Sequence, residues 1–265
     1  MRVAAVLALA LAVTLSGCAT VPVTGRSQLS IIPQSDLAAL GAQSYDEIAG
    51  AARLSDDAEA TAELERVGAR IADAAEAFMR QHGLAGELRH YDWQFRLVED
   101  DSTANAFCLP GGRIAAYTGI LPVARDETGL AVVIGHEVAH AVVNHGGERM
   151  SHLLLAELGG MALAKAIEEK PLETRRLLTL AYGIGAQVGV LLPYSRTQES
   201  EADRIGLILM ASAGYDPRAA ESFWRRMASR SGPEPPEFLS THPASAARIE
   251  RIREFLPEAL EYYGR

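Results

Sequence analysis

The chain has 265 residues, 48% of them hydrophobic, and carries a formal net charge of −9 at pH 7. This length is sufficient for one large domain with a buried core. The acidic balance, without a run of Lys or Arg, argues against a nucleic-acid partner, and the absence of a repeat at solenoid periods excludes a helical-repeat module.

The first twenty residues, MRVAAVLALALAVTLSGCAT, differ from the rest of the chain. Arg2 precedes an apolar run, Val3 to Val13, that is too short to span a membrane and is typical of a secretory signal peptide. The ending LSGC resembles a bacterial lipobox, which implies removal of residues 1–17 and lipid attachment to Cys18. The same resemblance implies, from Ala19, sorting to the outer membrane. The alternative is a plain signal peptide with an incidental cysteine.

The segment after this cysteine lacks hydrophobic periodicity. Residues 18–34 contain Pro, Gly and other turn-forming residues, which predicts a tether leading to a single domain over residues 35–265. Cys108 is the second of only two cysteines. With Cys18 acylated, Cys108 has no disulfide partner, so we expect packing to stabilise the domain.

Helical spacing of apolar residues then gives way to strand spacing. Amphipathic helices are predicted over residues 35–50 and 56–82. From Tyr91 to Val98 apolar and polar residues alternate, which predicts a strand with one buried face. Two short apolar runs flank Pro110-Gly111-Gly112 within residues 105–119, which predicts a β-hairpin. The fold is therefore expected to be α+β, mainly α, with a small antiparallel sheet.

The second half of the chain is predicted to be helical. One helix is expected over residues 126–146, and residues 177–193 predict a buried helix, with a groove or a membrane-facing surface as the alternative. Ser195 and Gln198 predict a capping box that starts another helix, which Gly214 ends. A loop at 231–242 and a last helix at 243–255 complete the prediction.

The helix predicted over residues 126–146 contains the sequence HEVAH. At about 100° per residue, His136, Glu137 and His140 share one arc of a helix that is otherwise apolar nearly all round. Such a helix is buried, and unpaired polar groups on it would cost several kcal/mol. A divalent metal ion supplies the partner, because residues four apart on one face can reach the same ion. Glu137 is then placed to act as a general base.

The alternative is that His136 and His140 are ordinary core histidines, but His-Glu-x-x-His on an apolar helix favours zinc. A catalytic zinc needs a third protein ligand. Metzincins would have histidine at position 146 and thermolysin-like enzymes glutamate near position 160, and both positions are glycine. The remaining candidate is the sequence SRTQESEADRIG, residues 195–206.

Glu199 and Asp203 are four residues apart in this sequence and share one helical face, whereas Glu201 lies about 200° from Glu199. We therefore expect Glu199 to be the third ligand. Asp203 is expected to accept a hydrogen bond from a ligand histidine and to orient it. The alternative is a solvated acidic helix start, which is the expectation for Glu201.

Four motifs in this order resemble metallopeptidase family forty-eight: NAFCLPGGRIAAYTG, HEVAHAVVNHGGERMS, YSRTQESEADRIG and STHP. The resemblance covers most of residues 21–256. The family contains gluzincins of the HtpX and CAAX prenyl protease type, and the sequence is most similar to the LoiP- and BepA-like periplasmic lipoprotein proteases. Membership implies a gluzincin scaffold with the sheet packed on the His-Glu-x-x-His helix. It also implies one Zn²⁺ per chain held by His136, His140 and Glu199, with Glu137 as base.

Three further assignments follow the resemblance. Asn105, Ala106 and Phe107 would begin an edge strand to which an extended substrate adds by main-chain hydrogen bonds, or they form a plain sheet edge. His242 would stabilise the oxyanion of the tetrahedral intermediate, or bind zinc as a removable fourth ligand, or lie in a surface turn. Arg248 is a second candidate for charge stabilisation, with an ordinary salt bridge as the alternative.

The combined expectation is a zinc endopeptidase of the bacterial periplasm, anchored through Cys18, that hydrolyses unfolded or misassembled envelope proteins. Its expected partners are extended polypeptides and a membrane, not nucleic acid. One alternative is an assembly factor or chaperone with a structural or latent zinc site, in which the apolar stretch 153–192 binds clients. Another is a soluble protease without an anchor.

Overall fold

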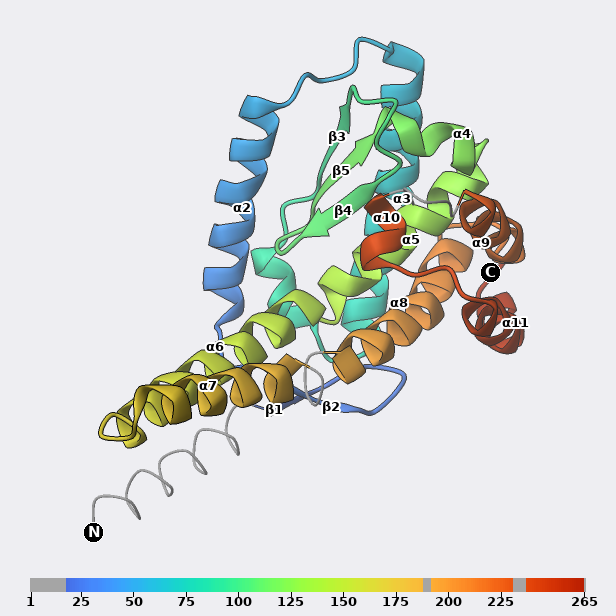
Figure 1. The fold of residues 1–265 in the computed structure, drawn as a ribbon. Coiled ribbons are helices and arrows are strands. Elements are labelled where there is room, and N and C mark those ends of the chain that lie inside the picture. Colours follow the sequence, from blue (N-terminus) through green and yellow to red (C-terminus); the bar gives the residue numbers. More distant parts are fainter. Residues whose placement is uncertain (1–17, 188–191, 231–236, 265) are drawn as a thin grey trace. The chain divides into compact units, whose positions relative to one another are not determined.

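The computed structural model describes residues 18–187, 192–230 and 237–264, and helices dominate them (Figure 1). The predicted signal peptide, residues 1–17, lies outside the described residues. Contacts divide the chain into two compact units, one of Met1–Pro33 and His145–Gln198 and a larger one of Gln34–Asn144 and Glu199–Arg265. In the part of the chain that is described, no helix is both long and hydrophobic enough to span a membrane.

The larger unit contains most of the helices. Asp57 caps α3 by accepting a hydrogen bond from the Ala60 amide, and one stripe of α3, including Leu64 and Ile71, is buried. Described helices of this unit are α2 (Gln34–Ala51), α3 (Ala58–Gln81), η1 (Ala85–His90), η2 (Thr118–Ile120), α4 (Leu121–Ala124), α5 (Glu127–Val142), α9 (Ala219–Ser229), α10 (Glu237–Thr241) and α11 (Ala246–Leu260). Helix α8 (Leu192–Ser212) belongs to this unit from Glu199 onward.

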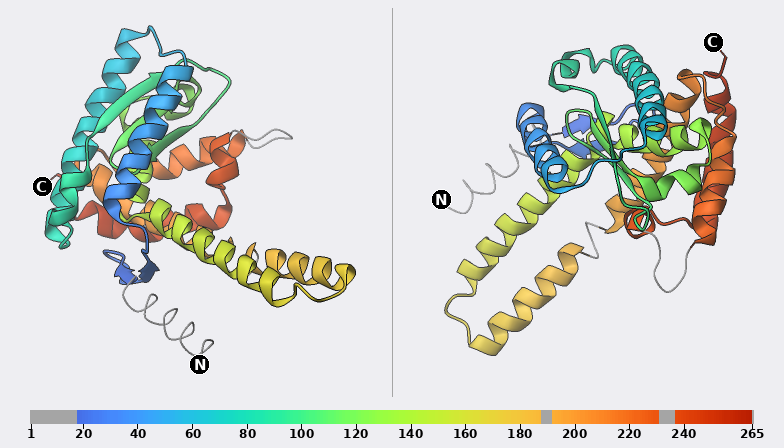
Figure 2. Two further views of the ribbon diagram at one scale, coloured as in Figure 1. Left: turned by 90° about the vertical axis from the view of Figure 1, so that its left-hand side faces the viewer. Right: turned by 90° about the horizontal axis from the view of Figure 1, so that it is seen from above.

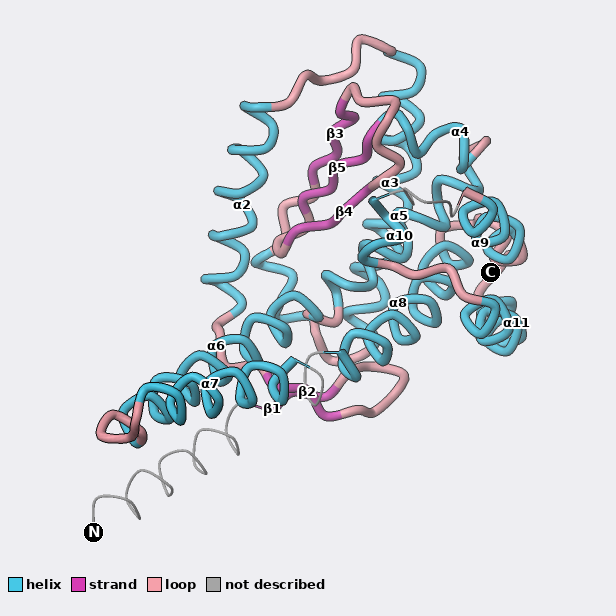
Figure 3. The backbone as a smooth tube through the Cα atoms, viewed as in Figure 1, coloured by secondary structure: helices cyan, strands magenta, loops and turns pink. Residues whose placement is uncertain are grey.

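A three-stranded sheet lies beside these helices (Figure 3). Its order is β3 (Gln94–Val98), β5 (Arg113–Tyr117), β4 (Ala106–Leu109), so β4 is an edge strand, and β4 packs on α5. The mainly α fold with a small sheet on the His-Glu-x-x-His helix is confirmed. The sheet is mixed rather than antiparallel, because β3 and β5 pair in parallel. Strand β5 lies between the other two strands. It runs antiparallel to β4 and parallel to β3.

The predicted hairpin is confirmed, with Gly111 and Gly112 at positive φ in its turn. The strand predicted from Tyr91 begins only at Gln94, since η1 extends to His90. Both predicted N-terminal helices are present as α2 and α3.

Helix α5 begins as predicted, with Asp126 accepting a hydrogen bond from the Gly129 amide. Its predicted end at Gly146 is wrong. The helix ends at Val142, because Asn144 adopts a left-handed conformation with φ 58°, and Gly146 lies inside α6. Every residue of α5 from Gly129 to Val142 is buried, as an apolar helix requires.

Three other predicted boundaries also change. Helix α8 begins at Leu192, so Ser195 is not its cap, although Gly214 at φ 82° follows its end as predicted. Helix α10 lies inside the predicted loop, of which residues 231–236 are outside the described residues. Helix α11 starts at Ala246, after its cap Ser245, whose side chain accepts a hydrogen bond from the Arg248 amide.

The smaller unit pairs two short strands with a helical hairpin. Strands β1 (Cys18–Thr20) and β2 (Ser27–Leu29) are antiparallel, so the segment expected as a tether contains local structure. Helices α6 (His145–Ala166) and α7 (Leu172–Ala186) run side by side in both further views (Figure 2). The prediction of a buried helix is wrong for α7, because Leu177 is 67% exposed. Residues 188–191 of that prediction lie outside the described residues. The division into signal peptide, tether and one domain stays a prediction.

Candidate metal centre

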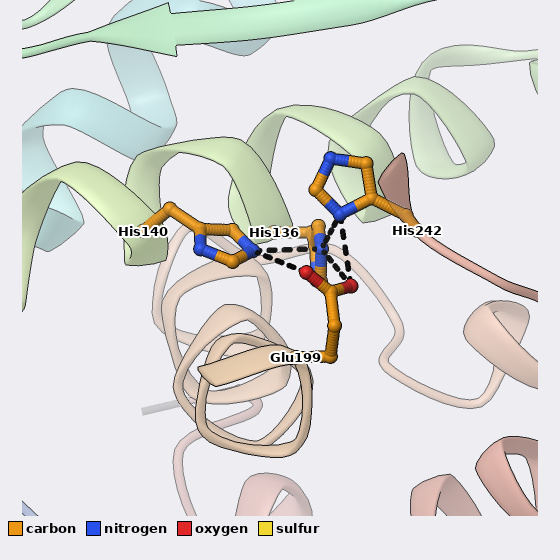
Figure 4. Close-up of side chains that lie close together, drawn as sticks. All are labelled: His136, His140, Glu199 and His242. Atoms are coloured by element: carbon orange, nitrogen blue, oxygen red, sulfur yellow. Dashed lines mark hydrogen bonds and ion pairs between the residues drawn. The ribbon is translucent and has the colours of Figure 1, made fainter. Parts of the chain in front are cut away.

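Four side chains direct nitrogen or oxygen atoms toward one point in the larger unit (Figure 4). They are His136 and His140 of α5, Glu199 of α8, and His242, which follows α10. The Nε2 atoms of the two α5 histidines are 3.1 Å apart, and carboxylate oxygens of Glu199 lie 3.4 Å and 3.3 Å from them. Nδ1 of His242 is 3.1 Å from Nε2 of His136 and 2.8 Å from Glu199.

These distances suit a tetrahedral zinc ion. Zinc bonds of 2.0–2.1 Å to nitrogen or oxygen place neighbouring ligands of a tetrahedron about 3.3 Å apart. The four donor atoms all lie within 4.8 Å of one another. Three imidazoles and one carboxylate are the ligand types that zinc takes in proteins. The residues therefore fit one zinc ion, with His242 in the fourth position.

Two glycines allow α5 and α8 to approach closely at this point. A β-carbon on Gly206 would lie 3.0 Å from the backbone N and Cα of His136, and one on Gly135 would lie 3.0 Å from the Gly206 carbonyl oxygen. Both distances are shorter than ordinary packing allows. The absence of side chains here lets the short acids of α8 reach the imidazoles of α5.

Asp203 and Arg248 form a buried pair behind the histidine ligand. Arg248 donates to Asp203 from Nε at 2.9 Å and from Nη2 at 2.7 Å. Oδ1 of the same carboxylate is 3.2 Å from Nδ1 of His136, which leaves Nε2 of that ring directed to the donor cluster. The guanidinium of Arg248 also lies over the ring of Trp224, 3.4 Å from its centroid. Asp203 thus occupies the position expected of a carboxylate that orients a ligand histidine.

Arg248 contacts Glu199 as well, with Nη1 3.2 Å from Oε2. Arg248 therefore forms salt bridges, the alternative weighed from the sequence, and these are buried because the residue is 1% exposed. In this position it holds two acids of the centre, Glu199 and Asp203, rather than facing open space where a substrate would bind.

Glu137 lies beside the donor cluster and is not part of it. One oxygen accepts a hydrogen bond from the backbone amide of Cys108 in β4. Its Oε1 is 3.4 Å from Nε2 of His242 and has no hydrogen-bond partner among the described residues. Burial raises the pKa of Glu137, although positive charge on His242 and His136 opposes this. A carboxylate with a raised pKa and a free oxygen suits proton transfer.

The charges of the centre are strongly coupled. Burial and Arg248 act to lower the pKa of His136, but hydrogen bonds to Asp203 and Glu199 outweigh them and raise it to about 9. Burial alone would raise the pKa of Glu199, yet hydrogen bonds from the three histidines hold it far below its ordinary value. The pKa of Asp203 is likewise lowered by Arg248 and His136 against the effect of burial. Without metal, these hydrogen bonds therefore favour a protonated His136 beside an ionised Glu199.

The predicted substrate strand lies at the edge of the sheet. Ala106 and Phe107 belong to β4, whose one strand partner among the described residues is β5. Asn105 precedes the strand, and its carbonyl accepts a hydrogen bond from the Tyr117 amide. This leaves one side of β4 without a strand partner in the part of the chain described, as an edge that accepts an extended peptide requires.

Sequence reasoning missed several residues of the centre. Trp224 and Phe238 pack edge-on to His136, with ring centroids 5.8 Å and 6.4 Å away. Glu201, expected as a solvated acid, is buried. Cys108 had no assigned role, and its amide is the hydrogen-bond donor to Glu137. Its thiol is buried, which raises its pKa. No spacing rule marks these contacts, because each joins elements far apart in the chain.

Comparisons with known proteins agree with this geometry. The model of peptidase family M48 matches residues 58–256. Mitochondrial metalloendopeptidase OMA1 of Schizosaccharomyces pombe is 40% identical over 63% of this chain and 48% of its own length. The OMA1 metalloendopeptidase of Bos taurus is 34% identical over 91% of this chain and 46% of its own. A putative beta-barrel assembly-enhancing protease of Vibrio cholerae is 34% identical over 59% and 34%. The chain thus spans about half the length, or less, of these curated relatives.

Proposed function

The chain belongs to peptidase family M48, and from this membership and the donor cluster we propose that it is a zinc metalloendopeptidase. The observation that carries the proposal is the convergence of His136, His140 and Glu199 beside Glu137, whose Oε1 accepts no hydrogen bond from the described residues. Relatives named as metalloendopeptidases support the same activity.

The proposed roles follow the geometry. His136, His140 and Glu199 would hold zinc, which when bound supplies a Lewis acid that polarises the scissile carbonyl and makes a water molecule more acidic. Glu137 would take the proton from the attacking water through its free Oε1 and pass it to the leaving amine. Asp203 would fix the ring of His136 through Nδ1 so that Nε2 faces the metal.

Substrate binding is proposed along β4. An extended polypeptide would add to this edge by main-chain hydrogen bonds, with Asn105, Ala106 and Phe107 at its start. Because the amide of Cys108 in the same strand bonds to Glu137, a peptide on β4 would lie beside the general base. Main-chain recognition requires an extended chain, so unfolded segments are the proposed substrates.

His242 is proposed as a removable fourth ligand rather than an oxyanion donor. Its Nδ1 lies inside the donor cluster, and its Nε2 faces Glu137. A catalytic zinc site keeps its fourth position open for water and substrate. His242 in that position would hold the enzyme latent until α10 moves away.

A cellular role at a bacterial envelope is the finer part of the proposal. The lipobox-like ending before Cys18 and the beta-barrel assembly-enhancing relatives of Vibrio cholerae and Yersinia pestis support a lipid-anchored periplasmic protein, bound to the outer membrane through Cys18. The OMA1 relatives are mitochondrial by name, so family membership alone does not select the compartment. The intact mass of the mature protein tests the anchor, because acyl chains on Cys18 add mass that a soluble form lacks.

A chaperone or assembly factor with a latent centre is the second candidate, favoured by the position of His242 and by exposed leucines on α6 and α7. Unfolded casein separates the two functions. The zinc-loaded chain with His242→Ala is expected to cleave casein and to lose cleavage when a chelator removes the metal. Suppression of aggregation by a chain that never cleaves casein, with or without His242, would favour the chaperone.

A further inference from the structure

The smaller unit carries an apolar surface that its described residues leave uncovered. Ten of the large hydrophobic side chains that are exposed in the described residues lie on α6 and α7: Leu153, Leu154, Leu155, Leu158, Met161, Leu172, Leu177, Leu178, Leu180 and Ile184. Isolated exposed leucines are common, but a group of this size on one hairpin marks an interaction surface.

The charges of the hairpin are separated from this surface. Between Leu177 and Gln187 no residue is charged, and in α6 Glu157 is the one charged residue from Leu153 to Ala164. Charged residues gather instead around the connection of the two helices, at Lys165, Glu168, Glu169, Lys170, Glu173, Arg175 and Arg176. A helix that is apolar over most of its circumference is expected in a protein core or in lipid.

The two helices meet along a narrow seam. Tyr182 of α7 donates a hydrogen bond to the Ala156 carbonyl, and its ring fills the space that a side chain on Gly159 would take. At 100° per residue, Leu155, Leu158 and Ala162 lie on one flank of α6 beside this seam, and Glu157 lies on the other.

In α7, Leu177, Leu180 and Ile184 share one flank, while Arg175 and Thr179 lie on the opposite one. Because the helices are antiparallel (Figure 2), the two apolar flanks form one face of the hairpin. Leu158 is 51% exposed on this face, and Leu177, Leu180 and Ile184 are 67%, 62% and 55% exposed.

The flank of α6 that carries Leu155 and Leu158 continues toward the start of the helix, where it contacts the segment that begins at Cys18. Glu148 and Ser151 precede Leu155 on this flank at helical spacing, and the N-terminal segment covers both. Arg26 forms an ion pair with Glu148, and the amide of Ile31 donates to the hydroxyl of Ser151.

Cys18 is itself exposed and pairs with Leu29 in the adjoining strands. The flank of α6 is therefore buried at Glu148 and Ser151, near the proposed acylation site, and exposed from Leu155 onward. A lipid attached to Cys18 would leave the chain beside the bare apolar face.

From this continuity we propose that the face formed by Leu155, Leu158, Leu177, Leu180 and Ile184 rests in the lipid surface to which Cys18 is anchored. The hairpin would lie flat in the interface, with its leucines in the acyl region and its charged connection among the headgroups. The inference rests on the membrane attachment proposed above. It adds a second point of attachment that would fix the orientation of the chain at the membrane.

The test uses the mature chain, residues 18–265, with Cys18→Ala, which lacks both the apolar signal peptide and the acylation site and leaves the hairpin as the remaining attachment. We expect this protein to float with vesicles of phosphatidylethanolamine and phosphatidylglycerol. Leu158→Glu with Leu177→Glu should reduce flotation by at least about tenfold, because two inserted side chains become charged. The matched control is Leu153→Glu with Leu172→Glu, two leucines that are 49% and 57% exposed on the other flank, and it should float as before.

Failure of the Cys18→Ala protein to float, or equal loss in both double variants, would overturn the inference. So would a change from oligomer to monomer in Leu158→Glu/Leu177→Glu without any effect on flotation, since a second copy would then cover the face. Circular dichroism confirms that each variant is folded. Cleavage of casein without vesicles is expected to be unaffected, so loss of peptidase activity with the flotation pattern intact would remove the proposed function alone.

Discussion

Asp203 accepts two hydrogen bonds from Arg248, and the same carboxylate lies 3.2 Å from Nδ1 of His136, so one acid connects the last helix of the chain to the metal centre. We predict that Asp203→Asn destabilises the chain by about 3–5 kcal/mol, because it removes one of the two carboxylates that neutralise the buried Arg248 and leaves Glu199 as the other. Zinc affinity should fall by about 10–100-fold, since His136 loses its orienting acceptor. Thermal denaturation and zinc competition with a chromophoric chelator measure the two effects.

The control for this variant is Asp92→Asn, which removes the exposed ion pair with Arg113. A surface pair of this kind is worth about 0–1 kcal/mol, so stability and zinc affinity should hardly change. A folded Asp203→Asn protein that binds zinc as tightly as the natural chain would contradict the orienting role.

Glu137→Gln is expected to retain zinc and to lose peptide cleavage by about 10²–10⁴-fold, the usual contribution of a general base. Glutamine keeps the size of the side chain and can still accept the hydrogen bond from the Cys108 amide. Zinc content and casein turnover are measured on the same preparation. Turnover at the natural rate in a zinc-loaded Glu137→Gln protein would remove the general-base assignment.

His242→Ala is expected to raise casein turnover by at least about tenfold, which corresponds to a closed form favoured by about 1.4 kcal/mol or more. The reason is that Nδ1 of His242 occupies the fourth position of the donor cluster. His82→Ala, in which the altered ring stacks on Phe78 in another part of the unit, is the control. Lower turnover with zinc retained would instead support oxyanion stabilisation by His242.

Gly206→Ala is expected to weaken zinc binding as well as stability. Its added carbon would lie 3.0 Å from the backbone of His136, so α5 and α8 must separate and Glu199 must move away from the imidazoles. Gly183→Ala is the matched control, because its added carbon meets nothing within 4 Å in α7, where alanine favours the helix by up to about 1 kcal/mol. Equal zinc affinity in the two variants would show that the close approach has no bearing on the metal.

Zinc binding is expected to release a proton from His136. Its pKa of about 9 in the metal-free protein means that the ring is protonated at pH 7 and must lose this proton to bind zinc. Apparent affinity should therefore rise about tenfold per pH unit between pH 7 and 8 from this group, and calorimetry in two buffers with different ionisation enthalpies counts the released protons. A binding constant independent of pH in this range would contradict the assignment.

Stability of the metal-free chain depends on pH in the opposite sense. Since the folded-state pKa of His136 is raised above its ordinary value of 6.5, the group contributes stability that is fully present below pH 6.5 and is lost as pH rises through 9. Thermal denaturation in the presence of a chelator measures this dependence.

The sequence predicts those parts of the centre that are set by helical periodicity. The four-residue spacings of His136 with His140 and of Glu199 with Asp203 each place two groups on one helix face. The structure brings these two faces together. A spacing rule contains no information on helix pairing, so the contacts of Trp224 and of the Cys108 amide could not be predicted.

Errors in the fold have the same origin. The end of α5 at Val142 depends on Asn144, a left-handed residue other than glycine, whereas two glycines follow at 146 and 147 and carry the stronger local signal. The parallel pairing of β3 with β5 is a property of strand order, which alternation does not encode. The apolar residues of α7 predict burial, but among the described residues nothing covers Leu177, Leu180 and Ile184.

Anomalous diffraction at the zinc edge, from crystals of the zinc-loaded chain, would locate the metal and identify its ligands. We expect one peak at about 2.0–2.2 Å from Nε2 of His136, Nε2 of His140 and a carboxylate oxygen of Glu199. A peak that lacks Glu199 among its ligands, or the absence of a peak between α5 and α8 in a zinc-saturated crystal, would contradict this expectation.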